Sequence, residues 1–433
     1  MKSKVVSRIE NRIYKLAKDV GGKVGLDLPY FVKNGSWVVL RQAVVAIGGL
    51  LLSVAFARMA TQEVFGQYQL VLSILAMVSI LSISGLNTSL IRSVARGYDG
   101  DYKKVVKISF LWSLLGIPTL LGIGGYYYLY QDQSLGIALM ISSMFFPFFY
   151  APNTWDSFLQ GKSRFDISAK YSSIQMIVNT IATISIIFFS RGNLIPIISV
   201  YLIPYTFFNG YYFWKSWKYI ENKKTNQDTI KYGWFLTKMN VLVLISEHID
   251  KILIGIIISP TALATYYIVA FLPIKIKEFG KPFFNVIFPK LASENVTIYK
   301  LIRDKVILFV GLFFGITVGA FIYWVVISRI SAALFGENYR EFYEYSKIYV
   351  VLLVLMIPLN IFAKYIQAKK QKIVIIMTDG VYPVVRIVIN VIFILKYGIF
   401  GAVVAYNVCL VILLAFYIGG IYFLDEKSTL GGS

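Results

Sequence analysis

Eleven charged side chains lie well inside the long apolar runs of this sequence, and chemistry inside a membrane would depend on them. They are Arg41, Lys238, Glu247, Asp250, Lys251, Lys275, Lys277, Glu278, Lys281, Asp379 and Arg386. A charge at the centre of a bilayer costs about 2.5–3.5 kcal/mol, so such side chains generally face a water-filled interior or a partner of opposite charge. Seven of the eleven are cations and four are acids. This surplus suits a diphosphate, because fixed cations replace the water that the group loses and arginine offers two parallel donors.

Five cations are the predicted ligands of an anionic head group: Arg41, Arg58, Lys238, Lys275 and Arg386. Lys275 and Arg386 each follow about thirteen residues of apolar span, which at helical rise corresponds to roughly 20 Å and to the middle of the membrane. Arg41 lies near the inner end of the first span and Arg58 near its outer end. For these two, the alternative is that the side chain reaches out to the nearest membrane surface.

Carboxylates near these cations suggest a second kind of site. Glu247, Asp250 and Lys251 are predicted to form either an ion-coupling site for H⁺ or Na⁺ or a salt-bridge latch between the two halves of the protein. Glu247 and Lys251 are four residues apart, and Lys275 and Glu278 are three apart. Each pair can therefore also neutralise itself on one helix face.

The sequence contains one histidine and one cysteine, His248 and Cys409. This count excludes multi-histidine metal chemistry and any cysteine-based metal cluster within one chain. No metal site and no cofactor are predicted, apart from the possible coupling ion, H⁺ or Na⁺. His248 can titrate near neutral pH, or it can serve as a hydrogen-bonded packing residue.

The elements that must position these residues are apolar helices. The chain of 433 residues is 57% hydrophobic and 15% charged, with a mean hydropathy of +0.67, whereas soluble chains are about 45–50% apolar and about 25% charged. Apolar runs of about twenty residues predict an all-α integral membrane protein with about twelve transmembrane helices. They are predicted near 35–57, 67–90, 105–129, 135–158, 168–189, 194–214, 233–258, 262–290, 306–328, 346–366, 373–395 and 399–424.

The net charge of +21 follows the loops between these spans. With a cytoplasmic amino terminus, the loops and termini on the inner side contain 26 Lys and Arg residues and the outer loops contain 5. The positive-inside rule therefore predicts a multi-pass protein of the cytoplasmic (inner) membrane with both termini in the cytoplasm. Charges spread over short loops are explained by topology, so no nucleic-acid partner is predicted.

Residues 1–34 are predicted to form an amphipathic cytoplasmic segment. Val5, Ile9, Ile13 and Leu16 recur at helical spacing with basic residues largely on the other side, which indicates a helix lying on the inner membrane surface. The alternative is a general positively charged anchor. Residues 425–433 are predicted to be a tail, whose last three residues, Gly431-Gly432-Ser433, carry no fold information.

Two halves of six spans each show weak self-similarity. Trp37-x-x-x-Arg41 matches Trp234-x-x-x-Lys238, and later motifs match in the same order. Because six spans return the chain to its starting side, the repeat relates two lobes by a pseudo-two-fold axis along the membrane normal. We predict an N-lobe over 35–214, a basic cytoplasmic linker over 215–232 and a C-lobe over 233–424, with the ligand in the cleft between the lobes.

Four short motifs carry a resemblance to a known family. They are Ala57-Arg58 followed by Phe65-Gly66-Gln67-Tyr68, then Gly85-Leu86-Asn87-Thr88-Ser89-Leu90-Ile91-Arg92, Asp250-Lys251-Ile252-Leu253-Ile254-Gly255, and Leu334-Phe335-Gly336-Glu337-Asn338-Tyr339. In these motifs the chain resembles the O-antigen and exopolysaccharide flippases of the multidrug/oligosaccharidyl-lipid/polysaccharide exporter superfamily. The resemblance implies a twelve-helix, two-lobed transporter that moves an oligosaccharide on an undecaprenyl pyrophosphate carrier from the inner to the outer leaflet.

The leading hypothesis is therefore a flippase that works by alternating access. The head group and glycan would enter a cationic cavity from the cytoplasm, while the polyprenyl tail would stay in the lipid between the lobes. The predicted partners are the lipid-linked oligosaccharide and the bilayer, together with a polysaccharide polymerase and glycosyltransferases. The sequence does not indicate which glycan is carried.

Two other functions compete with this hypothesis. A Na⁺- or H⁺-coupled multidrug exporter of the same fold would favour an acidic lining, which the surplus of cations opposes. A membrane polysaccharide polymerase or ligase would need an external catalytic domain, and the longest outward loop, 329–345, is too short for one. The chain also contains no P-loop, metal-ligand spacing or Ser-His-Asp candidate set, so no enzymatic activity is predicted.

Overall fold

The computed structural model describes residues 28–293, 306–368, 374 and 376–430. Within these residues, every regular element is a helix and none is a strand. The prediction of an all-α protein is thus confirmed for the described part of the chain. Residues 1–27 of the predicted amphipathic segment and residues 431–433 of the predicted tail lie outside it.

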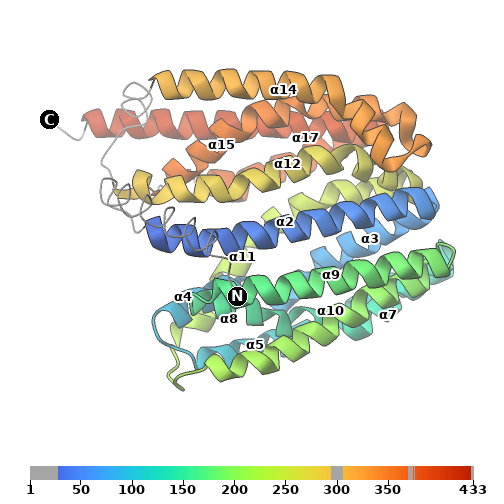
Figure 1. Ribbon diagram of the computed structural model, residues 1–433, viewed down its shortest axis with the longest axis horizontal. Coiled ribbons are helices and arrows are strands. Elements are labelled where there is room, and N and C mark those ends of the chain that lie inside the picture. The colour runs from blue at the N-terminus through green and yellow to red at the C-terminus, as the bar shows by residue number, and fades with distance from the viewer. Residues whose placement is uncertain (1–27, 294–305, 369–373, 375, 431–433) are drawn as a thin grey trace, which may run out of the picture.

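Within each described range of the chain, the helices follow one another with short connections (Figure 1). The first part of the chain forms α2 (Leu28–Met59), α3 (Gln62–Val78), η1 (Ser79–Ser82), α4 (Gly85–Ala95), α5 (Asp101–Ser113), α6 (Gly116–Tyr130), α7 (Gln133–Tyr150), η2 (Pro152–Thr154), α8 (Trp155–Gly161), α9 (Phe165–Phe189), α10 (Leu194–Ser216) and η3 (Trp217–Tyr219). The second part forms α11 (Asp228–Leu253), η4 (Ile254–Ile258), α12 (Pro260–Ser293), α14 (Val306–Phe335), η5 (Glu337–Tyr349), α15 (Val350–Ala368), η6 (Met377–Val381) and α17 (Tyr382–Leu430).

Polar residues begin several of these helices. The side chain of Thr61 accepts a hydrogen bond from the backbone N–H of Val64 at the start of α3, at 3.2 Å. Asp132 does the same for the N–H of Leu135 at the start of α7, at 2.8 Å. The first N–H groups of a helix have no partner within it, so such side chains satisfy donors that would otherwise be lost.

The long element α17 consists of two helices that meet at Gly398. This residue has φ 58° and ψ −135°, a conformation that glycine adopts without the steric cost of a side chain. The chain turns at this point, so the residues before and after Gly398 form separate helices. The two predicted spans 373–395 and 399–424 fall on either side of this break.

Nine helical segments among the described residues are long and apolar enough to cross a membrane, which makes the chain a multi-pass membrane protein. They are Gly35–Met59, Gln62–Ser82, Asp101–Tyr130, Gln133–Gly161, Phe165–Phe189, Leu194–Tyr219, Phe314–Phe335, Glu337–Ile366 and Met377–Tyr422. The predicted spans 233–258 and 262–290 coincide with α11–η4 and α12. These two helices are outside the set of nine, and they contain most of the predicted intramembrane charges.

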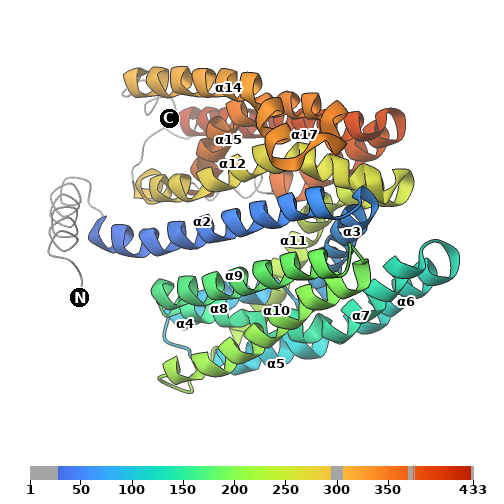
Figure 2. The same ribbon diagram turned by 45° about the vertical axis from the view of Figure 1, so that its right-hand side comes forward.

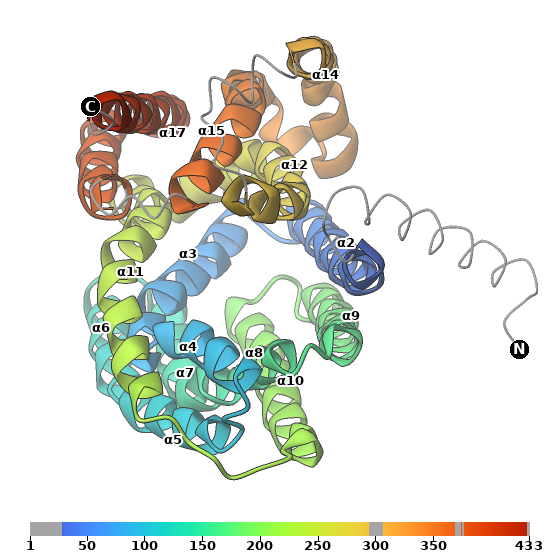
Figure 3. The same cartoon turned by 90° about the vertical axis from the view of Figure 1, so that its left-hand side faces the viewer.

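The helices run along the long axis of the molecule and gather in two groups. Figure 3, a view along that axis, shows α12, α14, α15 and α17 on one side and α4 to α10 on the other. We call these the α12–α17 group and the α4–α10 group. The helices α2, α3 and α11 lie between them, and α2 runs between α9 and α12 (Figure 2).

Two glycines allow the backbones of the central helices to touch the helices beside them. A Cβ atom at Gly66 of α3 would lie 1.7 Å from the carbonyl oxygen of Pro260 in α12. A Cβ atom at Gly85 of α4 would lie 2.4 Å from the carbonyl oxygen of Gly233 in α11. Such close approach is a general means of helix association in lipid, where packing rather than the hydrophobic effect holds helices together.

Candidate functional site

A polar cavity of about 320 Å³ lies among α11, α12 and α17. Five of the predicted site residues line it: Glu247, Asp250, Lys251, Lys275 and Arg386. The other lining residues are His248, Tyr266, Tyr267, Ala270, Phe271, Ile274, Lys277, Glu278 and Tyr406. The cavity is therefore built by α11 and the α12–α17 group, whereas the sequence predicts a ligand between two lobes.

Helical spacing and one chain turn bring these residues together. On α11, Glu247, Asp250 and Lys251 are three and four residues apart and so share one face. Arg386 lies on α17 before Gly398 and Tyr406 lies after it. The break at Gly398 folds the second half of α17 back, so that the Arg386 guanidinium carbon lies 5.8 Å from the centroid of the Tyr406 ring.

Lys275, one of the two predicted mid-membrane cations, is paired with an acid. Its Nζ lies 2.8 Å from Oε2 of Glu278, one helical turn along α12. Both side chains are about one third exposed. The pair is the one that their spacing allows, and in this conformation Lys275 contributes no uncompensated charge to the cavity.

Arg386, Lys277 and Lys251 line this cavity without an acidic partner among the described residues. Among the described residues, neither the guanidinium of Arg386 nor the ammonium group of Lys277 forms an ion pair or a side-chain hydrogen bond with an acid. Lys277 Nζ donates to the hydroxyl of Tyr406 at 3.1 Å and lies 5.6 Å from the ring centroid. Sequence reasoning placed Lys277 in a span but did not select it as a ligand.

The charges that line the cavity leave a small positive surplus. Four cations, Lys251, Lys275, Lys277 and Arg386, face three acids, Glu247, Asp250 and Glu278. With a neutral histidine the difference is one positive charge. This excess of one is smaller than the excess of three among the eleven intramembrane charges of the sequence.

Asp250 is buried and already has hydrogen-bond donors. The hydroxyl of Tyr266 donates to its Oδ2 at 2.6 Å, and the backbone N–H of Lys251 donates to its Oδ1 at 2.8 Å. Tyr266 is on α12, so its hydrogen bond to Asp250 joins α11 to the α12–α17 group. A bond from Asp250 to the α4–α10 group is not present among the described residues in this conformation.

His248 differs from the hydrogen-bonded packing residue that one reading of the sequence predicts. Its Nδ1 is buried and has no hydrogen-bond partner within the described part of the chain. The side chain lines the polar cavity. A buried polar atom without a partner is costly, and this one is available to a bound ligand or water.

A second cavity of about 260 Å³ adjoins the first. The two share Glu247, Lys277, Arg386 and Tyr406. The second cavity extends along η6 and both halves of α17. It is also lined by Ser246 of α11, Thr378 and Asp379 of η6, Tyr382 before Gly398, and Leu413 and Tyr417 after it. Asp379, an intramembrane acid in the sequence, therefore belongs to the same connected space as Arg386, and with it the acids of the two cavities equal the cations, four against four.

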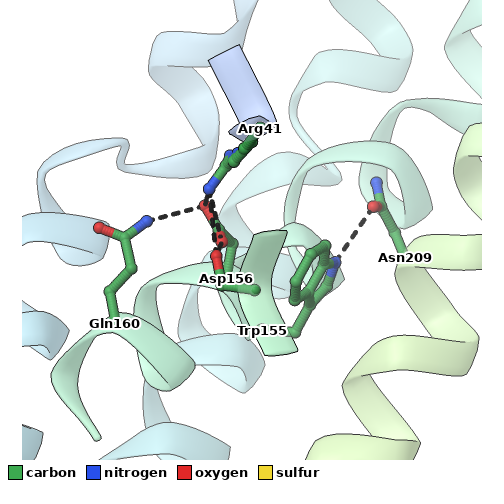
Figure 4. A network of polar contacts seen from close by, with 6 residues as sticks. Arg41, Trp155, Asp156, Gln160 and Asn209 are labelled. Atoms are coloured by element: carbon green, nitrogen blue, oxygen red, sulfur yellow. Dashed lines mark hydrogen bonds and ion pairs between the residues drawn. The ribbon is translucent and has the colours of Figure 1, made fainter. Parts of the chain in front are cut away.

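Arg41 lies away from both cavities and is bound by an acid (Figure 4). Its Nη1 is 3.0 Å from both carboxylate oxygens of Asp156 on α8 and donates to Ser168 Oγ on α9 at 3.1 Å. Gln160 also donates to Asp156, at 2.9 Å. This network holds α2 against α8 and α9, so in this conformation Arg41 has a structural role.

Arg58 and Lys238 also lie outside the cavities. Arg58 donates from Nε to the carbonyl oxygen of Leu334 at 2.8 Å and from Nη2 to that of Ala333. It thus caps the end of α14, where carbonyl groups lack partners within the helix. Lys238 is exposed on α11. Of the five predicted head-group cations, Lys275 and Arg386 are brought together and the other three are not.

The comparisons with known proteins give a family and a fold. The family described as "Polysaccharide biosynthesis protein" matches residues 31–294, which is more than half of the chain. No curated protein sequence matches the chain significantly.

Solved membrane-protein structures match nearly the whole chain. An inward-facing multidrug resistance MATE family transporter of the MOP superfamily has a TM-score of 0.66 at 13% identity, covering 90% of this chain and 99% of that one. The lipid II flippase MurJ in an inward closed conformation has a TM-score of 0.62 at 16% identity, covering 90% of each chain. A MOP superfamily transporter from Pyrococcus furiosus has a TM-score of 0.53 at 13% identity, covering 92% and 96%. At these identities the likeness establishes the fold.

Proposed function

The chain belongs to the polysaccharide biosynthesis protein family, and from this membership we propose that it flips an oligosaccharide linked to undecaprenyl pyrophosphate from the inner to the outer leaflet of the cytoplasmic membrane. The observation that carries the proposal is the polar cavity in which Arg386 and Lys277 have no acidic partner among the described residues. The fold that the chain shares with the lipid II flippase MurJ supports a lipid-linked substrate.

The two cations supply what a diphosphate needs when it leaves the membrane surface. The planar guanidinium of Arg386 can donate two parallel hydrogen bonds to phosphate oxygens, and the ammonium group of Lys277 acts as a compact charge beside it. An outward-moving group with about two negative charges is helped by a potential that is negative inside, by about 2.3 kcal/mol per charge per 100 mV. The loaded half of the cycle then needs no ion gradient.

The architecture that we propose for this activity is twelve crossings in two six-helix lobes, related by a pseudo-two-fold axis along the membrane normal. The nine apolar segments, the charged α11–η4 and α12, and the division at Gly398 together give twelve. The lobes would be 35–214 and 233–424, joined by the linker 215–232. The excess of basic residues in one set of loops supports placing both termini in the cytoplasm.

We also propose how transport is coupled to an ion and which proteins act before and after it. Glu247, Asp250 and Lys251 face the space where Arg386 lies, and we propose that a proton or Na⁺ at the carboxylates of Glu247 and Asp250 resets the empty transporter. We propose glycosyltransferases and a polysaccharide polymerase as the proteins that supply and consume the lipid-linked substrate. Nucleic acid has no part in this scheme, and the protein would transport its substrate without chemical change.

Transport by the purified protein in vesicles tests the proposal. Proteoliposomes would contain a fluorescent undecaprenyl pyrophosphate-linked sugar, and a membrane-impermeant reagent would report its movement between leaflets. We expect flipping that depends on the protein and is faster when an imposed potential drives negative charge in the direction of movement. Equal rates at either sign of the potential would contradict the charge mechanism, and no flipping above empty vesicles would contradict the function.

A multidrug exporter of the same fold is the second candidate. The three acids of the cavity, Glu247, Asp250 and Glu278, favour it, because they can bind an organic cation. A MATE multidrug transporter also shares the fold. In the same vesicles, uptake of a fluorescent organic cation driven by a Na⁺ or H⁺ gradient would support the exporter, and its absence alongside lipid flipping would support the flippase.

A further inference from the structure

An apolar groove of about 500 Å³ lies beside the second polar cavity. One wall is a single face of α17, where Ile412, Ala415, Phe416 and Gly419 recur at helical spacing. The opposite wall contains Val374 and Met377. Neighbouring apolar residues on both walls are exposed, namely Ile376, Val411, Ile418 and Tyr422. The groove therefore opens on the surface of the molecule that faces the membrane.

The groove and the second polar cavity lie on the two sides of the contact between η6 and α17. Met377 lines the groove and Thr378 lines the cavity, and the same alternation holds for Phe416 and Tyr417 on α17. The ring centroids of Tyr382, in the cavity wall, and Phe416, in the groove wall, are 6.5 Å apart. These two aromatic side chains stand where the polar and apolar spaces meet.

From the first cavity through the second to the groove, which shares no lining residue with either, the lining changes from charged to apolar. The first two share Arg386 and Lys277, the second adds Asp379 and apolar residues such as Leu413, and the third is apolar throughout. A molecule that fits all three has an anionic head and a long hydrocarbon tail. A soluble anion or a compact organic cation would leave the groove without a role.

We propose that this groove binds the isoprenoid tail of the lipid whose diphosphate occupies the polar cavity, with the tail passing beside Tyr382 and Phe416. The inference rests on the proposed function and adds a tail site to it. It also replaces the expectation that the tail stays between the lobes. Burial of apolar surface by the groove gives an affinity that grows with tail length.

Gly419 gives the groove a sharp test. A Cβ atom there has no other atom within 4 Å, so a larger side chain can fill the groove without displacing its walls. Gly319 is also exposed, and a Cβ atom there would have no other atom within 4 Å. It lies on α14, which does not line the groove. Gly419→Leu and Ala415→Phe therefore fill the groove, and Gly319→Leu is the matched control.

The experiment measures binding of inorganic pyrophosphate and of geranyl, farnesyl and geranylgeranyl diphosphates to the purified full chain. We expect the affinity of the unmodified protein to rise with each isoprene unit. The two groove-filling variants should lower geranylgeranyl diphosphate affinity about tenfold, within the range expected when part of the tail is no longer buried. Pyrophosphate binding should not change, and Gly319→Leu should behave like the unmodified protein.

The outcome that overturns the tail site is an unchanged dependence on chain length in both groove-filling variants. A photoreactive geranylgeranyl diphosphate gives an independent readout: cross-links on the Ile412–Gly420 stretch of α17 support the groove, and cross-links confined to α2 or α14 overturn it. If excess phospholipid abolishes the cross-links as effectively as unlabelled prenyl diphosphate, the groove is an ordinary lipid contact and the inference is wrong.

Failure of the proposed function gives a different pattern. Arg386→Gln removes a head-group ligand and leaves the groove intact, so it should weaken pyrophosphate and all three prenyl diphosphates alike. Unchanged pyrophosphate binding in this variant would contradict the cationic head-group site. The chain-length dependence and the cross-links would still decide the tail site.

Discussion

The guanidinium of Arg386 lies 5.8 Å from the centre of the Tyr406 ring, on which Lys277 also rests at 5.6 Å. Two cations thus share one neutral aromatic partner. Neither has an acid in contact among the described residues, and like charges in a medium of low dielectric constant repel each other. An anion that enters the cavity relieves this repulsion, which is the physical basis for a diphosphate site.

Two replacements of Arg386 should distinguish the contribution of its charge to flipping from that of its two-donor geometry. Arg386→Gln removes the charge and should lower the rate of flipping at least about tenfold, the effect of losing roughly 1.4 kcal/mol of interaction. Arg386→Lys keeps the charge but loses the two-donor geometry, so its rate should be intermediate. Flipping in proteoliposomes measures both. Arg329→Gln, at an exposed position on α14, is the control, and equal rates in all three variants would remove Arg386 from the site.

Because Lys275 and Glu278 form an ion pair, replacing one or the other should change the affinity for pyrophosphate in opposite directions. Glu278→Gln frees the ammonium group of Lys275 and should raise the affinity for pyrophosphate, whereas Lys275→Met leaves an unpaired carboxylate and should lower it. Each change should be a few-fold, because the side chains are about one third exposed and solvent screens the charges. Calorimetric titration measures it. A fall in affinity for Glu278→Gln would show that the ion pair is needed intact.

Arg41 should behave as a structural residue. Arg41→Gln and Asp156→Asn should each lower the free energy of unfolding by about 1 kcal/mol, as expected for a partly exposed ion pair with additional hydrogen bonds. The double variant should lose less than the sum of the two, because the contact can be lost only once. Thermal unfolding in detergent measures this. Weaker pyrophosphate binding in Arg41→Gln but not in Asp156→Asn would instead restore Arg41 as a head-group ligand.

Gly66 should not tolerate a side chain. Gly66→Ala places a Cβ atom 1.7 Å from the Pro260 carbonyl oxygen, so α3 and α12 must separate, at a cost of about 1–3 kcal/mol. Gly315→Ala is the matched control, since nothing lies within 4 Å of that position on α14. The midpoint of thermal unfolding should fall for Gly66→Ala and stay the same or rise for Gly315→Ala. Equal midpoints would contradict the close packing of these helices.

The sequence predicts the helices well because lipid imposes a strong requirement on them. Long apolar runs mark nine segments that the structure also contains. Lys275 and Arg386, which their depth within the spans selects as head-group candidates, line one cavity. The motif glycine at Gly66 has a visible reason, which is contact between two backbones. These features depend on local composition or on one residue, and both can be read from a single chain.

The remaining site depends on contacts between residues far apart in the sequence. Arg41 and Asp156 are separated by 115 positions, and Lys277 and Tyr406 by 129. Nothing in the local pattern distinguishes a cation that will meet an acid from one that will rest on an aromatic ring. Depth in the membrane selected Lys275, whereas its neighbour Lys277 is the one that remains without an acid.

The hydrogen bonds by which Arg58 caps α14 depend on the side chain of only one of the residues involved. Its acceptors are the main-chain oxygens of Ala333 and Leu334, which every amino acid supplies and which do not titrate. Substitutions at residues 333 and 334 therefore leave these hydrogen bonds intact, and so does a fall in the pH of the surrounding medium. All of the selective constraint on this contact is concentrated on one arginine.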